Sequence, residues 1–242
     1  MGEVKTLLIL LEVVFFFYFS NLVSWIYKYC KYICDSKKSP SSRLCYIIQN
    51  PNLIKELIIT GAEQLWISGI TYIKTVQGFS YLSFITDAYS IKIVGYSLHP
   101  TLETVSFLKA LEMTISNWKK GYSFYLIHHS DRIIQYCCNE YTNILRQHGI
   151  AISMTQNGNP YDNALAEIVN GALKNEFYPK RVYQPHRDAS KNIDRIIRIY
   201  NKLRPHASLD FQTPEKEHYN SGEIKRRWGN YSRKPKSAIE EL

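Results

Sequence analysis

The amino-acid sequence predicts an α/β fold in which a mixed β-sheet is flanked by helices. Three β-rich runs follow one another between about residues 64 and 100, which is typical of a strand meander. After residue 100, helical segments alternate with short apolar strands. Because the chain has 242 residues, of which 45% are hydrophobic, it contains enough apolar material for one large core.

The meander consists of "ISGITYIKT", "SYLSFITDAYS" and "IKIVGYSLHP", and the turn "VQGF" separates the first two runs. A helix is expected over residues 101–118, with Thr101 as its N-cap. The spacing of its apolar residues predicts one buried face. That face would contain Leu102, Val105, Leu108, Leu111 and Ile115.

The second half of the chain continues the alternation. "YSFYLIHHSD" is predicted to be a buried strand, and the helix after it is expected to end at Gly149. "IAISM" follows as a short strand, and "TQNGNPYDN" has the composition of a loop. Two more helices are expected, over residues 163–177 and 192–203.

The N-terminal region differs from the rest of the chain. Residues 7–27 are mostly apolar and about long enough to span a bilayer, although Glu12 and several polar residues interrupt them. A membrane segment and a damaged or truncated region both remain open. We divide the sequence into an atypical hydrophobic N-terminal segment (1–35), a linker (36–59), a core (60–222) and a basic tail (223–242).

The net charge of +9 predicts an anionic partner, with nucleic acid as the first candidate and a membrane surface as the second. A basic surface without a partner is the alternative. The five cysteines have no C-x-x-C spacing, and no histidine precedes His99, so no Cys/His zinc site is predicted near the N-terminus. Reduced thiols in a cytoplasmic protein are the expectation.

Two carboxylates are the first candidates for catalysis. Asp131 follows the C-terminal end of a predicted strand, where α/β sheets commonly bind ligands. Glu167 lies early in the helix predicted over 163–177, away from the apolar face of Leu165, Ile168, Val169, Ala172 and Leu173. It can therefore project over the end of the sheet. Taken alone, such a pair is more often two solvated surface charges.

The motifs around these acids resemble a known family. They are "HSD" at 129–131, "NGNPYDNALAE" at 157–167, "LKNE" at 173–176 and "YNKLRPHASLDFQTP" at 200–214. Together they resemble the catalytic core of bacterial insertion-sequence transposases of the D,D,E type (the OrfB family), which are relatives of retroviral integrases. The 35 residues between Asp131 and Glu167 match the spacing of that family. The resemblance implies a ribonuclease H-like fold.

The resemblance also implies a chemistry. Enzymes of this family cleave DNA and transfer strands with Mg²⁺ or Mn²⁺ held by two aspartates and a glutamate, and Asp131 and Glu167 match the second and third of these acids. Carboxylate oxygens suit Mg²⁺, and two ions can stabilise the attacking and leaving oxygens of a phosphodiester. The implied partners are DNA (transposon ends and target), further copies of the chain in a homo-oligomer on DNA, and a separate upstream helix-turn-helix protein.

The first acid of the resembling family is missing. The family motif reads D-I-T-Y, and "GITY" places Gly69 at the position of the aspartate. A glycine inside a strand can mark a bulge, a close backbone approach or a lost side chain. The resemblance favours a lost carboxylate and impaired catalysis. Asp87 in the next strand is a possible substitute, although a structural role at the Ser90 turn is the expected one.

Basic residues complete the predictions. Lys174, Lys180, Arg181 and Arg204 are candidates for contacts with DNA phosphates, with solvated charges as the alternative. Neighbouring residues of a strand point to opposite faces, so at most one of His128 and His129 is expected to face the site. The sequence thus predicts a transposase-family protein with impaired catalysis. The alternative is a non-catalytic DNA-binding or regulatory relic.

Overall fold

The computed structural model describes residues 50–118, 125–156, 163–177 and 186–220. The hydrophobic segment 1–35, the basic tail 223–242, and the DNA-contact candidates Lys180 and Arg181 lie outside these ranges. Within them, no helix is both long and apolar enough to cross a membrane.

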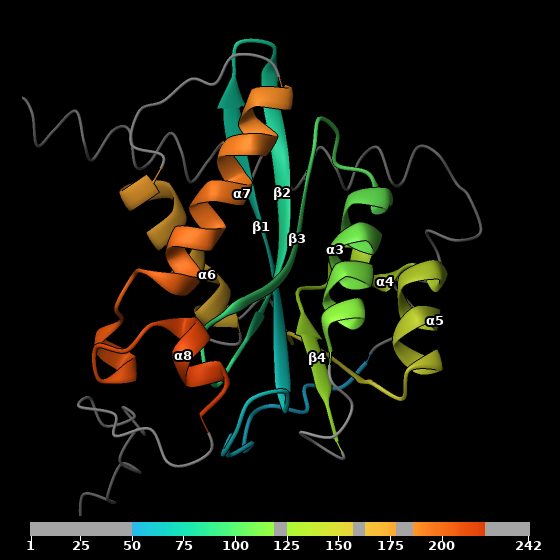
Figure 1. Ribbon diagram of the computed structural model, residues 1–242. Coiled ribbons are helices and arrows are strands. Elements are labelled where there is room, and N and C mark those ends of the chain that lie inside the picture. Colours follow the sequence, from blue (N-terminus) through green and yellow to red (C-terminus); the bar gives the residue numbers. More distant parts are fainter. Residues whose placement is uncertain (1–49, 119–124, 157–162, 178–185, 221–242) are drawn as a thin grey trace, which may run out of the picture. The chain divides into compact units, whose positions relative to one another are not determined.

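Five strands form one mixed sheet in the order β3-β2-β1-β4-β5 (Figure 1). The meander is confirmed, since β2 pairs antiparallel with both β1 and β3. On the other side of β1, β4 and β5 continue the sheet in parallel. The strands are β1 (Leu65–Thr75), β2 (Gly78–Asp87), β3 (Ile93–His99), β4 (Ile127–Ser130) and β5 (Ala151–Met154).

The pairing of β1 with β2 is regular along its whole length. Val76 and Gln77 form the loop between the strands, and the register then runs without interruption from Thr75 opposite Gly78 back to Trp66 opposite Asp87. Gly69 lies opposite Phe84 in this register. Gly69 therefore does not mark a bulge.

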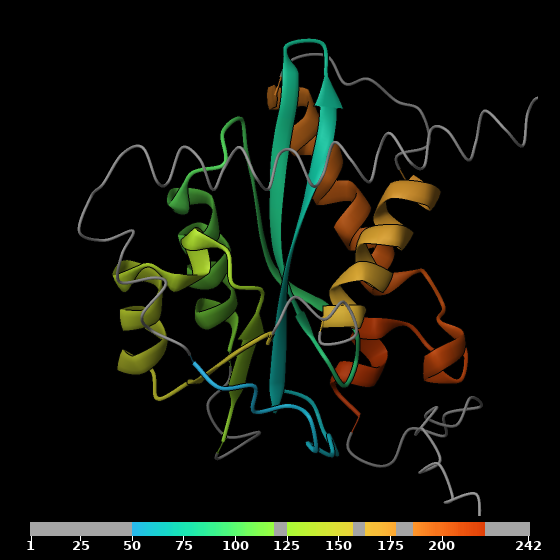
Figure 2. The same cartoon turned by 180° about the vertical axis from the view of Figure 1, so that it is seen from behind.

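Helices cover both faces of the sheet (Figures 1 and 2). One face carries α3 (Thr104–Asn117), α4 (Ile134–Cys137) and α5 (Asn139–Gln147). The other carries α6 (Ala164–Ala172), its π-helical continuation η2 (Leu173–Phe177) and α7 (His186–Lys202). The chain then forms the short helices η3 (Ala207–Leu209) and α8 (Pro214–His218).

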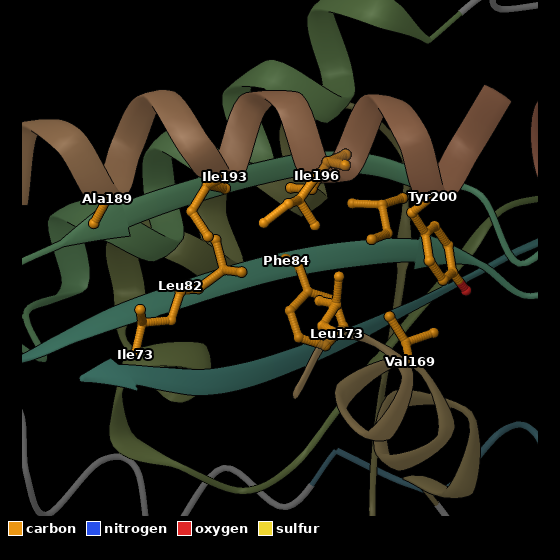
Figure 3. Packing of buried hydrophobic residues seen from close by; sticks show 11 residues of the cluster. Ile73, Leu82, Phe84, Val169, Leu173, Ala189, Ile193, Ile196 and Tyr200 are labelled. Atoms are coloured by element: carbon orange, nitrogen blue, oxygen red, sulfur yellow. The ribbon is translucent and has the colours of Figure 1, made fainter. Parts of the chain in front are cut away.

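The sheet separates two apolar clusters because successive residues of a strand point to opposite faces. Phe84 of β2 belongs to the cluster under α6 and α7, and its neighbour Ile85 belongs to the cluster under α3 and α5. Figure 3 shows the first cluster, in which α7 contributes Ala189, Ile193, Ile196 and Tyr200. Residues 50–59 contact the core as well: the amide of Leu53 donates to Ser153 Oγ of β5 at 2.9 Å.

Several local predictions are wrong. The N-cap of α3 is Glu103, and Thr101 instead binds the ring of His99 through its hydroxyl at 2.9 Å. Val105 is exposed, so the buried face of α3 is displaced from the predicted one. Ile168 is also exposed, because the side of α6 that meets the sheet carries Ala166 and Val169. Finally, α7 begins at His186, six residues before the predicted start at 192.

Candidate active site

The site forms where α6 crosses the middle of β1. β4 pairs with β1 no further than Ile67. Beyond this point, two carbonyl groups of β1 accept hydrogen bonds from asparagine side chains: Asn163 Nδ2 lies 3.4 Å from Ser68 O, and Asn170 Nδ2 lies 3.1 Å from Ile70 O. These contacts hold α6 against the strand segment that contains Gly69.

The structure brings Asp131 and Glu167 together. Asp131 follows β4, and Asn163 at the start of α6 donates a hydrogen bond to its carboxylate. Burial raises the pKa of Asp131, the hydrogen bond from Asn163 acts against this, and the negative charge of Glu167 raises the pKa further. Because Glu167 is exposed while Asp131 is partly buried, the pair opens toward solvent on the Glu167 side.

Gly69 faces the same helix, but its side-chain position is filled. A Cβ atom at residue 69 would lie 3.1 Å from the Cβ of Ala166, the residue before Glu167. It would lie only 2.4 Å from Cζ and 2.8 Å from Cε2 of Phe84. These distances are shorter than carbon atoms tolerate, so the ring of Phe84 occupies the place of the missing side chain.

The importance of Phe84 was not predicted from the sequence, although a signal was present. A two-residue loop at Val76 and Gln77 pairs residue 75 with 78. Counting back along both strands pairs Gly69 with Phe84. The direction in which the ring leans depends on packing against α6 and α7, which the sequence does not reveal.

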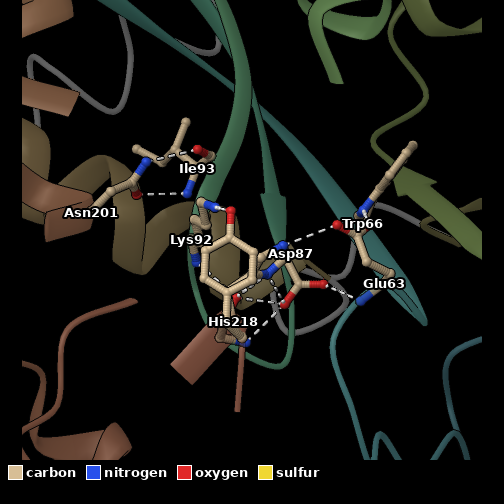
Figure 4. Close-up of polar contacts among 9 residues, drawn as sticks. Glu63, Trp66, Asp87, Lys92, Ile93, Asn201 and His218 are labelled. Atoms are coloured by element: carbon tan, nitrogen blue, oxygen red, sulfur yellow. Dashed lines mark hydrogen bonds and ion pairs between the residues drawn. The ribbon is translucent and has the colours of Figure 1, made fainter. Parts of the chain in front are cut away.

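Asp87, the proposed substitute ligand, is fully engaged elsewhere (Figure 4). Its side chain is completely buried. One carboxylate oxygen accepts from the amide of Glu63 at 2.7 Å, and the other accepts from the amide and hydroxyl of Ser90 at 2.9 and 2.7 Å. His218 of α8 lies 3.6 Å from the same carboxylate. The structural role expected at the Ser90 turn is therefore confirmed.

His218 joins Asp87 to a second buried carboxylate. Its Nε2 lies 3.0 Å from Glu63, which also accepts a hydrogen bond from the indole of Trp66 at 2.7 Å. Burial disfavours the charged form of His218, but the hydrogen bonds with Asp87 and Glu63 outweigh burial, so the pKa of His218 is raised. We call Glu63, Asp87, Ser90 and His218 the α8 anchor.

The two histidines before Asp131 have structural roles. His128 Nε2 lies 2.6 Å from Ser68 Oγ and 2.9 Å from the Tyr141 hydroxyl. Burial, together with the neighbouring His129, lowers the pKa of His128 to about 3, so its ring is neutral. His129 is also buried and lies 2.8 Å from Ser153 Oγ of β5. Both rings therefore join strands and helices around β4.

Of the predicted DNA-contact residues, Lys174 lies within η2, which continues the helix of Glu167, and Arg204 contacts η2. Lys174 Nζ lies 4.1 Å from the ring centre of Tyr72, and burial lowers its pKa. Arg204 forms an ion pair with Glu176 of η2, and its Nη1 lies 2.7 Å from the ring of His206. Burial and the neighbouring Arg204 lower the pKa of His206 to about 4, so a neutral ring accepts this hydrogen bond.

The donor set at the site fits a single divalent cation. Mg²⁺ is commonly bound through one or two carboxylates, with water and substrate completing its ligands. A cation between Asp131 and Glu167 would relieve the repulsion that raises the pKa of Asp131. Within the described residues, no cluster of three or more His, Cys, Asp or Glu side chains is arranged to hold a metal. In the described part of the chain, the candidate site therefore offers two carboxylates to a cation.

Comparisons with known proteins identify the family to which this fold belongs. The integrase core domain matches residues 60–160, and a second form of that domain matches residues 148–214. The transposase of insertion element IS904 from Lactococcus lactis is 34% identical over 72% of this chain and 69% of its own length. The IS600 31 kDa protein from Shigella sonnei is 36% identical over 68% of this chain, and the match spans 60% of that relative.

A solved structure shares the fold. The catalytic core domain of HTLV-2 integrase, solved in complex with magnesium, superposes with a TM-score of 0.52 at 18% sequence identity. The match covers 66% of this chain and 98% of the integrase domain. The predicted ribonuclease H-like arrangement is therefore confirmed.

Proposed function

Because this chain belongs to the insertion-sequence transposases, we propose that it has the core of a DNA-cleaving and strand-transferring enzyme whose own catalysis is impaired. One observation carries the proposal. The position that faces Ala166 on the helix of Glu167 has no carboxylate, and the ring of Phe84 occupies its volume.

Asp131 and Glu167 would hold Mg²⁺ or Mn²⁺ in this core. A bound divalent cation supplies charge stabilisation for the phosphate oxygens and for the leaving oxygen. With two carboxylates in place of three, the cation is held more weakly and the scissile phosphate is less precisely positioned. Removal of a central catalytic group commonly costs several orders of magnitude in rate, and the same is expected here.

We expect the protein to retain DNA binding although its catalysis is impaired, because much of the affinity for DNA comes from contacts with phosphates. We propose that Lys174, which belongs to η2, and Arg204, which forms an ion pair with Glu176 of η2, contact the phosphates of the bound DNA. We propose that the protein binds transposon ends and target DNA and assembles on DNA as a homo-oligomer. We also propose that it acts in the cytoplasm with a separate upstream helix-turn-helix protein.

The direct test is a strand-joining assay on a branched DNA substrate, which lessens the need for recognition of specific ends. The full chain is incubated with Mg²⁺ or Mn²⁺ beside its Glu167→Gln variant. We expect no joining above the level of Glu167→Gln, together with a DNA mobility shift that weakens as salt increases. Metal-dependent joining that disappears in Glu167→Gln would contradict the proposed impairment.

A regulatory role is the second candidate. The regular β1–β2 register around Gly69 and the filled core support this candidate, because they are expected of a chain that folds without the carboxylate. A folded chain that binds DNA without cutting it can occupy DNA ends or enter an assembly with an active relative. Mixing this chain with an active insertion-sequence transposase should then lower the strand-transfer rate of the latter, and an unchanged rate would exclude this role.

A further inference from the structure

We propose that Phe84 blocks the first metal-ligand position, so that a carboxylate at residue 69 restores metal binding only when Phe84 is also replaced by a smaller side chain. This inference rests on the proposed function, because it concerns the ligand that the proposed metal site lacks. It goes beyond the proposed function because it assigns part of the loss of catalysis to Phe84. It also predicts that the reverse mutation Gly69→Asp is not sufficient by itself.

The β1–β2 register places both residues on one face of the sheet. Gly69 and Phe84 are direct cross-strand partners, and such pairs bring their Cβ atoms within about 5.5 Å of each other. Glycine has no Cβ, so the ring of Phe84 can lean across the strand and cover the exposed backbone, as aromatic residues do beside strand glycines. The ring atoms Cζ and Cε2 are the ones that a Cβ at residue 69 would meet.

The ring of Phe84 is packed within the apolar cluster under α6 and α7. Phe84 is completely buried, and Figure 3 shows its ring beside Leu173, with Val169 nearby. Both of these residues come from the continuous helix formed by α6 and η2. On the other side of residue 69, Ala166 of the same helix is already 3.1 Å from the missing Cβ. A side chain at residue 69 must therefore displace a packed ring or the helix that carries Glu167.

An aspartate at residue 69 would meet the phenyl ring. Its Cβ would overlap Cζ and Cε2 of Phe84, and overpacking of this kind is destabilising. Gly69→Asp alone is therefore expected to distort the packing between β1, β2 and α6 and to misplace the new carboxylate. A smaller residue at position 84 removes the overlap and leaves room for the aspartate side chain.

The claim that Phe84 fills the side-chain position of residue 69 is tested by thermal unfolding of the full chain. Gly69→Ala and Phe84→Val are combined in a double-mutant cycle. Gly69→Ala should lower the Tm by about 5 °C in the natural background. In the Phe84→Val background it should have no effect or raise the Tm, because alanine is otherwise preferred to glycine inside a strand. Phe107→Val is the matched control, since Phe107 is equally buried in the cluster on the opposite face of the sheet. Equal Tm changes from Gly69→Ala in all three backgrounds would overturn the inference.

The claim that a carboxylate at residue 69 restores metal binding is tested by titration with Mn²⁺. Electron paramagnetic resonance measures the concentration of the free ion. The variant with both Gly69→Asp and Phe84→Val should bind Mn²⁺ at least about tenfold more tightly than either single variant. Binding by Gly69→Asp alone that equals the double variant would overturn the inference. If the Tm cycle shows coupling but the double variant gains no Mn²⁺ affinity, the proposed metal site is wrong while the packing of Phe84 against residue 69 stands.

Discussion

Two groups of carboxylates lie at the same sheet and differ in what surrounds them. In the α8 anchor, Asp87 and Glu63 are buried, and backbone amides, a hydroxyl, an indole and His218 surround them. At the candidate active site, Asp131 receives a hydrogen bond from Asn163 but faces the negative charge of Glu167. The anchor therefore stabilises the fold, while the pair at the candidate site carries a charge repulsion that a bound cation would relieve.

This contrast distinguishes the structural acids Asp87 and Glu63 from the candidate functional acids Asp131 and Glu167. A buried carboxylate whose oxygens are all hydrogen-bonded has little capacity left for a ligand, whereas two neighbouring carboxylates with few partners are candidates for a binding site. The pKa of His218 and the pKa of Asp131 are both raised, but for opposite reasons. His218 is surrounded by carboxylates that favour its charged form, and Asp131 by burial and a like charge that disfavour its charged form.

Replacing Asp87 should have the largest effect. Asp87→Ala leaves the amides of Glu63 and Ser90 without their partner and removes one of the two carboxylates beside His218. Breaking a buried pair in this way costs about 3–5 kcal/mol of unfolding free energy. Urea unfolding measures the loss. Glu112→Ala on the exposed side of α3 is the control and should change stability by less than about 0.5 kcal/mol. A similarly small effect of Asp87→Ala would remove the distinction between the two groups.

His218 should give the α8 anchor a pH dependence. Its pKa is raised in the folded state, so its contribution is fully present below the unfolded value of 6.5 and is lost as the pH rises through the folded value. His218→Gln is expected to cost about 1.5–3 kcal/mol at pH 6 and less at pH 8.5. Urea midpoints of both proteins across this range measure the difference, and parallel curves would exclude His218 as the titrating group.

Asp131→Asn should separate metal binding from stability. The affinity for Mn²⁺ should fall at least about tenfold, since one of two ligands loses its charge. The unfolding free energy should stay within about 1 kcal/mol of the natural chain or rise. The rise would occur at neutral pH, because the raised pKa of Asp131 means that the natural chain loses stability as the pH increases through that value. A destabilisation as large as that of Asp87→Ala would assign Asp131 to the structural acids.

The ion pair of Glu176 and Arg204 should have the smallest effect. Both side chains are partly exposed, and such pairs contribute about 0.2–1 kcal/mol. Glu176→Gln should therefore lower stability only slightly, and the difference should shrink in high salt. Differential scanning calorimetry at two salt concentrations measures it. A loss of several kcal/mol would show that this ion pair stabilises the fold as strongly as the buried contacts of the α8 anchor.

The sheet could be predicted from the sequence because its signals are local. β-Branched and aromatic runs, with the turn signal "VQGF" between the first two, predicted the meander. The strand β1 begins at Leu65, within two residues of the expected start at Ile67. Helix ends and faces were harder to predict. Thr101 has the right chemistry for an N-cap, but His99 binds its hydroxyl and the helix starts after Glu103. Ile168 looks like a core residue by type, yet α6 approaches the sheet through its small residues.

The residues of the candidate site that belong to sequence motifs could be predicted. The residues whose role depends on side-chain packing could not. Asp131 and Glu167 were identified from their motifs, and the structure brings them together. The contact of Phe84 with residue 69 depends on the direction of a ring within a core built from β1, β2, α6, η2 and α7. The anchor joins Asp87 to His218 across a long separation in sequence. No spacing rule connects these segments.

The most direct test of the account compares strand joining on branched DNA by four full-length proteins, with Mg²⁺ or Mn²⁺. They are the natural chain, Gly69→Asp, Phe84→Val and the variant with both changes. The account expects joining only by the double variant, because it alone has the third carboxylate and the space to hold it. Joining by the natural chain at the rate of the double variant would contradict the account, since the missing carboxylate would then have no part in catalysis.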